Sequence, residues 1–157
     1  MFEIIKKDLV KPDTITFLSL LTGYNYFGLV QEAQQLFNSM ESQYQITPST
    51  KHHNCMVDVL ARTGQFEEAE RYVELMSTVN VITWKTLLGA CRSQGNIEKA
   101  DYYAKKAIAL DPNDASIYVL LVNIYAKAGL YEKEAEVRLE MKKRGIKKIP
   151  WNELDSH

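Results

Sequence analysis

The stretch "ARTGQFEEAE", residues 61–70, places Gly64 five residues before Ala69, with an acidic pair between them. The glycine follows a run with helical apolar spacing and precedes another such run. A glycine between two helical runs is typical of a residue that ends a helix by adopting the left-handed conformation. Because the alanine is small, two helices can pack closely at this point. The stretch therefore predicts a helical hairpin.

Similar stretches recur along the chain. They begin at Gly28 ("GLVQEA"), at Gly95 ("GNIEKA") and, in altered form, at Gly129 ("GLYEKEA"), where Glu134 stands in the place of the alanine and Ala135 follows. The four glycines are separated by 36, 31 and 34 residues. A period near 34 residues is typical of helix–turn–helix units that stack into a solenoid. We therefore expect an all-α fold, a right-handed superhelix of helix–turn–helix repeats.

Apolar spacing predicts eight helices, and residues 1–9 are read as the end of a further helix. The expected ranges are 16–26, 30–42, 51–63, 66–77, 82–94, 97–110, 115–128 and 131–144. Each pair begins after a residue that favours the N-cap position. These predicted caps are Asp13, Ser49, Asn80 and Asp114. The aromatic and aliphatic residues that recur inside the first helices are expected in the core.

Composition and charge narrow the possible functions. The 157 residues are 46% hydrophobic and 25% charged, which is ordinary for a globular protein, and the net charge is −1. Nonspecific polyanion binding needs many cation–phosphate contacts, so this charge argues against it. A protein that reads exposed bases stays compatible with it.

Other classes of protein lack support in the sequence. Cys55 and Cys91 fall inside helical patterns without disulfide or metal-ligand spacing, so we expect buried, reduced thiols. No apolar run has the length of a membrane span, and the first ten residues do not form a secretion or transit signal. We expect no cofactor, metal site or membrane contact.

Aligned on their glycines, the units resemble pentatricopeptide repeats, a family of helical-hairpin RNA readers. The phrases "CMVDVLARTG", "LLGACRSQGNIE" and "YVLLVNIYAKAG" resemble the plant-type PLS class, as in DYW-type organelle RNA-editing factors. That class carries long and short repeats followed by two extension motifs, E1 and E2. The resemblance divides the chain into the end of a preceding repeat at 1–13, a long repeat at 14–49, a short repeat at 50–80, E1 at 81–114, E2 at 115–148 and a tail at 149–157.

In this family, the side chains at the fifth and last positions of a repeat read one base. The short repeat places Asn54 and Asn80 there, a combination that resembles the pyrimidine-type pair. Lys51, at the second position, would flank the base through its aliphatic stem. A purely structural interpretation competes with this one: Asn80 is then only an N-cap, and Asn54 is a solvated residue on a helix face.

The other repeats offer weaker RNA-binding candidates. The long repeat has Leu18 and Ser49 at these positions, and Leu18 is expected to pack rather than bind. The E1 motif has Lys85 and Asp114, which do not form a recognised reading pair, and Asp114 is expected to be a cap. Val119 of the E2 motif has no group that can hydrogen-bond a base.

A basic cluster, "MKKRGIKK", closes the last predicted helix. Its cations are Lys142, Lys143, Arg144, Lys147 and Lys148. They suit the negative end of a helix dipole, and the alternative is a local contact with RNA phosphates.

The resemblance also implies partners and a location. Zinc deaminases of this family carry H-x-E and C-x-x-C motifs, and this sequence has neither, so it is not expected to catalyse deamination by itself. The expected partners are single-stranded RNA, a cytidine deaminase domain in cis or in trans, and editing-complex proteins. The expected site is a mitochondrion or chloroplast, and the start within a repeat suggests a fragment. The alternatives are a tetratricopeptide-like protein–protein scaffold, which the pattern of residues 81–148 suits, and an inert structural cap.

Overall fold

The structure is a computed structural model that describes residues 13–146, so the helix end expected at residues 1–9 lies outside this range. Within residues 13–146 the chain is all-α, with eight helices and no strand. The helices are α2 (Thr14–Phe27), α3 (Val30–Ser42), α4 (Thr50–Arg62), α5 (Phe66–Glu74), α6 (Val81–Gln94), α7 (Ile97–Leu110), α8 (Ala115–Lys127) and α9 (Tyr131–Arg144).

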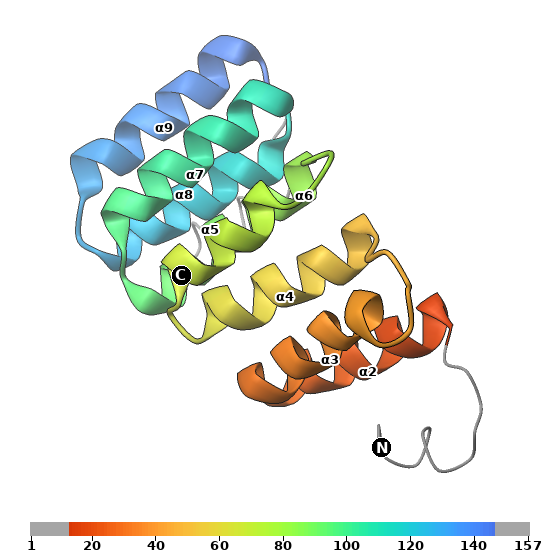
Figure 1. Ribbon diagram of the computed structural model, residues 1–157. Coiled ribbons are helices and arrows are strands. Elements are labelled where there is room, and N and C mark those ends of the chain that lie inside the picture. The colour runs from red at the N-terminus through yellow and green to blue at the C-terminus, as the bar shows by residue number, and fades with distance from the viewer. Residues whose placement is uncertain (1–12, 147–157) are drawn as a thin grey trace. The chain divides into compact units, whose positions relative to one another are not determined.

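The helices form four consecutive hairpins in two compact units, residues 1–79 and 80–157 (Figure 1). In the first unit α2 packs on α3, and α4 packs on α5. In the second unit α6 packs on α7, and α8 packs on α9. Within each unit the first helices of the two hairpins also pack on each other, α2 with α4 and α6 with α8. The predicted all-α fold of helix–turn–helix repeats is confirmed.

Each hairpin turns at the predicted glycine. Gly64 has a φ of 82° and Gly95 a φ of 67°, both in the left-handed region that a side chain disfavours. After α4, the Gly64 N–H donates to the Ala61 carbonyl at 3.0 Å, and the Gln65 N–H donates to the Leu60 carbonyl at 2.8 Å. This pair of bonds is the Schellman motif, and it satisfies carbonyls that the helix end leaves without partners.

The alanine of the repeated stretch lies where the two helices of a hairpin meet. Ala33, Ala69 and Ala100 are at most 1% exposed, as the close packing of helices requires. The fourth hairpin differs, because Glu134 takes this place and pairs with Arg138 at 3.1 Å, while Ala135 is exposed. The altered fourth copy therefore closes its hairpin without a buried alanine.

The first helices supply most of the buried apolar residues. Phe17, Leu21, Leu60, Leu88 and Ile117 are all completely buried. The expectation for the cysteines holds for Cys91, which is buried, whereas Cys55 is only half-buried. Trp84 is also only partly buried, and Lys106 on α7 lies 6.0 Å from the centroid of its ring. No helix in the described part of the chain has both the length and the apolar character of a membrane span.

The predicted N-caps are confirmed. Asp13 accepts from the Thr16 N–H at 2.8 Å, Asn80 accepts from the Thr83 N–H at 3.3 Å, and Asp114 accepts from the Ser116 N–H at 3.0 Å. Ser49 forms a capping box with His52 instead. As a result α2, α4, α6 and α8 begin at the first residues of the four predicted motifs.

His52 stands where glutamate or glutamine usually completes a capping box. Its Nδ1 accepts from the Ser49 N–H at 3.0 Å, and its Nε2 lies 2.9 Å from the carbonyl oxygen of Thr14 on α2. A backbone N–H only donates and a carbonyl only accepts, so the ring is neutral with its proton on Nε2. Burial lowers the pKa of this imidazole, which favours the same form.

One helix is shorter than expected. The sequence predicted a helix over 66–77, but α5 ends at Glu74, and the chain continues irregularly through Leu75 and Met76. Beside this early end, α3, the start of α4 and residues 75–77 border a groove of about 530 Å³. Phe37 and Glu41 of α3 line it.

In the second unit, polar contacts tie three helices together. The Tyr125 hydroxyl on α8 donates to Asp101 on α7, and Lys133 on α9 pairs with the same carboxylate at 3.3 Å. Lys133 also lies 5.5 Å from the centroid of the Tyr125 ring, within cation–π range. Burial and the Asp101 carboxylate both raise the pKa of Tyr125, so the phenol stays protonated and donates.

Two glycines of α6 test the turn mechanism. A Cβ added at Gly95 or at Gly89 meets no atom within 4 Å, so backbone conformation decides the outcome. We expect Gly95→Ala to lower the free energy of unfolding by about 1–2 kcal/mol, because alanine resists the left-handed region. Gly89→Ala, inside the helix, is expected to raise it by about 0.5–1 kcal/mol. Urea unfolding measures both, and a loss of stability at Gly89 would contradict this explanation.

His52 predicts a dependence of stability on pH. Its pKa lies below the ordinary value of 6.5 in the folded chain, so the unfolded chain binds more protons once the pH falls toward that value. The stabilisation is present above pH 6.5 and is lost as the pH falls toward the folded pKa. His52→Gln keeps the acceptor of the capping box without titrating. We expect the free energy of unfolding to fall more for the wild type than for His52→Gln when the pH is lowered through this window. Equal falls in the two proteins would exclude His52 as the cause.

Candidate nucleic-acid interface

The short-repeat candidates on α4 lie where a ligand can reach them. Lys51 is exposed on the first turn, and Asn54 is half-buried as the fifth residue of the helix. The Lys51 ammonium has no ion-pair partner among residues 13–146. The first two turns of α4 therefore present a cation and an amide.

The next turns of α4 are joined to α2 by polar contacts. Cys55 Sγ lies 3.8 Å from Thr22 Oγ1, and the Asn25 amide donates to Asp58 at 2.7 Å. Burial raises the pKa of the Cys55 thiol, so this thiol stays protonated. Sequence reasoning missed these contacts, because they join residues more than thirty positions apart.

Asn80 combines its cap with a free donor. Its Oδ1 caps α6, and its side chain is exposed. Within the described part of the chain, its Nδ2 has no partner. Asn80 belongs to the second unit and Asn54 to the first.

The long-repeat candidates offer less to a base. Leu18 is half-buried and apolar, and its carbonyl accepts from the Thr22 hydroxyl at 2.7 Å. Ser49 is exposed, but its Oγ lies 2.7 Å from His52 Nδ1. Because Nδ1 is an acceptor, the Ser49 hydroxyl donates to it. This hydroxyl is therefore used inside the capping box.

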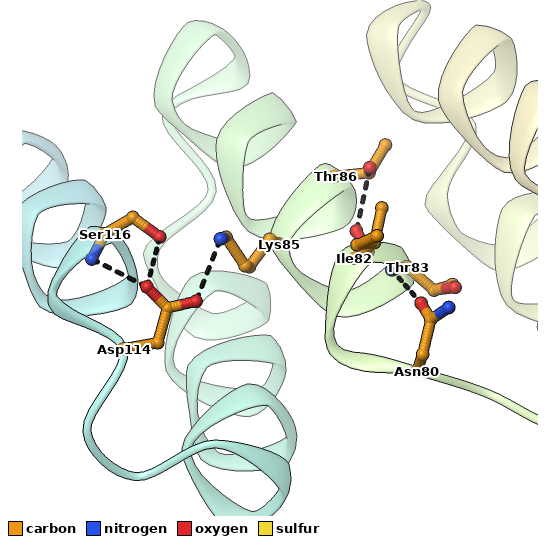
Figure 2. Close-up of polar contacts among 7 residues, drawn as sticks. All are labelled: Asn80, Ile82, Thr83, Lys85, Thr86, Asp114 and Ser116. Atoms are coloured by element: carbon orange, nitrogen blue, oxygen red, sulfur yellow. Dashed lines mark hydrogen bonds and ion pairs between the residues drawn. The ribbon is translucent and has the colours of Figure 1, made fainter.

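The structure brings the E1 candidates together. Lys85 Nζ lies 2.9 Å from Asp114 Oδ2, and the other carboxylate oxygen accepts from the N–H and hydroxyl of Ser116 at 3.0 and 2.7 Å (Figure 2). Burial opposes ionisation of Asp114, but the hydrogen bonds from Lys85 and Ser116 outweigh it and lower the pKa. The two side chains are therefore a partly desolvated ion pair.

Of the basic cluster, Lys142, Lys143 and Arg144 lie within the described residues, whereas Lys147 and Lys148 lie outside them. The three are exposed in the last turn of α9, where the helix dipole favours cations. Arg144 pairs with Glu140 at 2.8 Å. The phosphate-binding alternative for this cluster stays a prediction.

No group of His, Cys, Asp and Glu side chains among residues 13–146 is arranged to hold a metal ion. What the described candidates supply is hydrogen bonding and charge. Asn54 and Lys51 present an amide and a cation in the first unit, Asn80 presents an amide in the second unit, and the ion pair fastens α6 to α8.

The repeated hairpins define the class of the chain as a helical-hairpin repeat protein. Sequence comparisons specify the family. Residues 1–63 match the family model of the pentatricopeptide repeat domain, residues 52–81 and 82–105 match that of the PPR repeat, and residues 94–152 match that of the E motif. The chain belongs to the pentatricopeptide repeat family.

Curated relatives agree with this assignment. Two mitochondrial pentatricopeptide repeat-containing proteins of Arabidopsis thaliana are 41% and 38% identical, each over 99% of this chain. A chloroplastic one from the same plant is 35% identical over 96%. This chain spans 25%, 21% and 20% of their respective lengths. The names agree with the predicted mitochondrion or chloroplast.

Solved structures share the fold. The pentatricopeptide repeat protein PPR10 from maize matches over 90% of this chain and 21% of its own, with 23% identity and a TM-score of 0.73. PPR10 in complex with an 18-nt psaJ RNA element matches over 92% of this chain and 22% of its own, with a TM-score of 0.75. At this identity the likeness supports the helical-repeat fold.

Two changes at Asp114 separate its cap from its ion pair. Asp114→Ala removes both, and we expect it to lower the free energy of unfolding by about 1–2 kcal/mol. Asp114→Asn keeps an equally good cap and removes only the charge, so its loss should be less than half as large. Urea unfolding near neutral pH measures the difference, and equal losses would show that the cap contributes nothing.

Proposed function

We propose that this chain is the C-terminal repeat and E-motif segment of a single-stranded RNA-binding protein that acts in organelle C-to-U RNA editing. In this proposal the short repeat contributes limited base recognition. The extension motifs at 81–148 dock a cytidine deaminase domain, in cis or in trans. Editing-complex proteins are further partners, and the site of action is a mitochondrion or chloroplast.

The observation that carries the RNA-binding proposal is the presence of an amide at both the fifth and the last position of the short repeat. Asn54 is the fifth residue of one first helix, and Asn80 caps the start of the next. A carboxamide offers both donors and an acceptor, so it can match the edge of an exposed pyrimidine. Lys51, one turn before Asn54, is exposed and can flank the same base.

The editing part of the proposal has a different basis. The E motif matches over residues 94–152, and the Arabidopsis relatives carry mitochondrial or chloroplastic in their names. PPR10, which shares the fold, binds an RNA element in its solved complex. Deamination itself requires zinc-bound water and a glutamate, and the deaminase domain would supply these.

The alternative is a tetratricopeptide-like scaffold that binds proteins and no RNA. The net charge of −1 and the Lys85–Asp114 ion pair favour it, because neither attracts a polyanion. This alternative predicts that no single-stranded RNA binds at all.

A titration of labelled single-stranded RNA, followed by fluorescence anisotropy, tests the proposal. We expect the chain to prefer a pyrimidine-containing strand over oligoadenylate. Asn54→Ala and Asn80→Ser should each weaken this preference several-fold, about 1 kcal/mol or more. Serine keeps the cap of α6, so the effect of the second change is a loss of the amide rather than of the helix start.

Asn38→Ala is the matched control, because Asn38 is an exposed asparagine on a second helix, α3. It should bind like the wild type. If both test variants keep the wild-type preference, Asn54 and Asn80 do not read a base. If the wild type binds no RNA, the scaffold alternative is favoured.

A further inference from the structure

The second unit repeats the positions of the two amides with different chemistry. Asn54 is the fifth residue of α4, and Lys85 is the fifth residue of α6. Asn80 is the N-cap of α6, and Asp114 is the N-cap of α8. Lys85 and Asp114 therefore occupy the places that the proposed reading pair occupies one hairpin earlier.

We propose that Lys85 and Asp114 form a base-reading position that their own ion pair holds closed, so that base recognition ends at the short repeat. The ligand that the opened position would take is a pyrimidine base of single-stranded RNA. This inference rests on the proposed RNA-binding function.

Most of the acceptor capacity of the Asp114 carboxylate is already used. One oxygen of Asp114 accepts two hydrogen bonds from Ser116, at 3.0 and 2.7 Å, and the other accepts from Lys85 at 2.9 Å (Figure 2). Thr86, the residue after Lys85, has a hydroxyl that already donates a hydrogen bond to the Ile82 carbonyl at 2.9 Å. A base approaching this position meets groups that are already hydrogen-bonded.

Opening the pair with RNA is unfavourable. The Lys85 ammonium keeps two further N–H groups, but drawing it away from Asp114 onto a base would leave the carboxylate unpaired beside an RNA phosphate. The side chains of Lys85 and Asp114 are only 30% and 18% exposed, so water compensates poorly for the lost partner. Repulsion between the Asp114 carboxylate and the RNA phosphate adds to this cost.

Asn80 is an example of an N-cap residue whose side chain keeps hydrogen-bond donors for a base. It caps its helix through Oδ1, as Asp114 does through a carboxylate oxygen, yet its exposed amide nitrogen keeps its donors. The difference is chemical, since an uncharged amide attracts no lysine. Replacing the ion pair by two asparagines should therefore make this position available to a base. The asparagine at position 114 should still cap α8.

The double variant Lys85→Asn/Asp114→Asn tests this. It removes one charge of each sign, so the net charge is unchanged and nonspecific attraction to RNA stays constant. The probes are an oligoadenylate strand with one pyrimidine and the same strand with two adjacent pyrimidines. We expect the second pyrimidine to tighten binding of the double variant by about fivefold to tenfold and to leave wild-type binding unchanged.

The control Lys85→Arg keeps both the ion pair and the Asp114 cap of α8, and it should behave like the wild type. One outcome is that the double variant gains nothing from the second pyrimidine while the wild type still prefers one pyrimidine over none. In that case the proposal that the ion pair blocks base reading is wrong, and the proposed function stands. If none of the proteins binds any strand, both fail. Circular dichroism checks folding, and Lys85→Gln/Asp114→Asn replaces the double variant if that variant does not fold.

Discussion

The fold depends on reversing the chain between two packed helices within two or three residues. A residue in the left-handed region does this while its own N–H and the next one satisfy the last carbonyls of the helix, as Gly64 does for Ala61 and Gln65 for Leu60. The buried Ala69 follows at a fixed distance, so the turn also sets where the second helix touches the first. The remaining surface of each first helix is then available to the next hairpin or to a ligand.

Adjacent first helices are joined by the same hydrogen bond in both units. Arg62, two residues before its turn glycine, donates to the Asn25 carbonyl at 3.1 Å in the last turn of α2. Lys127, also two residues before its glycine, donates to the Arg92 carbonyl at 3.2 Å in the last turn of α6. The carbonyl end of a helix carries partial negative charge, so a cation stabilises it. This bond therefore stabilises the contact between the two first helices of each unit.

The sequence predicted what depends on local pattern. The glycine period and the apolar spacing located all eight described helices, and short polar residues marked the caps. It did not predict the Lys85–Asp114 ion pair, because these residues are 29 positions apart and meet only when α6 packs on α8. His52 was overlooked because histidine rarely completes a capping box, and α5 ended early although its helical pattern continues. The ion pair depends on the packing of α6 on α8, whereas the His52 capping box is a local contact.

The cap requirement also restricts which residues can read a base. The last residue of each repeat must accept a hydrogen bond from the next helix, so only what remains of its side chain can face RNA. Serine has a single hydroxyl, and Ser49 uses it on His52. Aspartate has oxygens only, and its charge recruits a lysine at Asp114. Asparagine alone among these caps keeps free donors without charge, which is why the proposed base reading centres on Asn80.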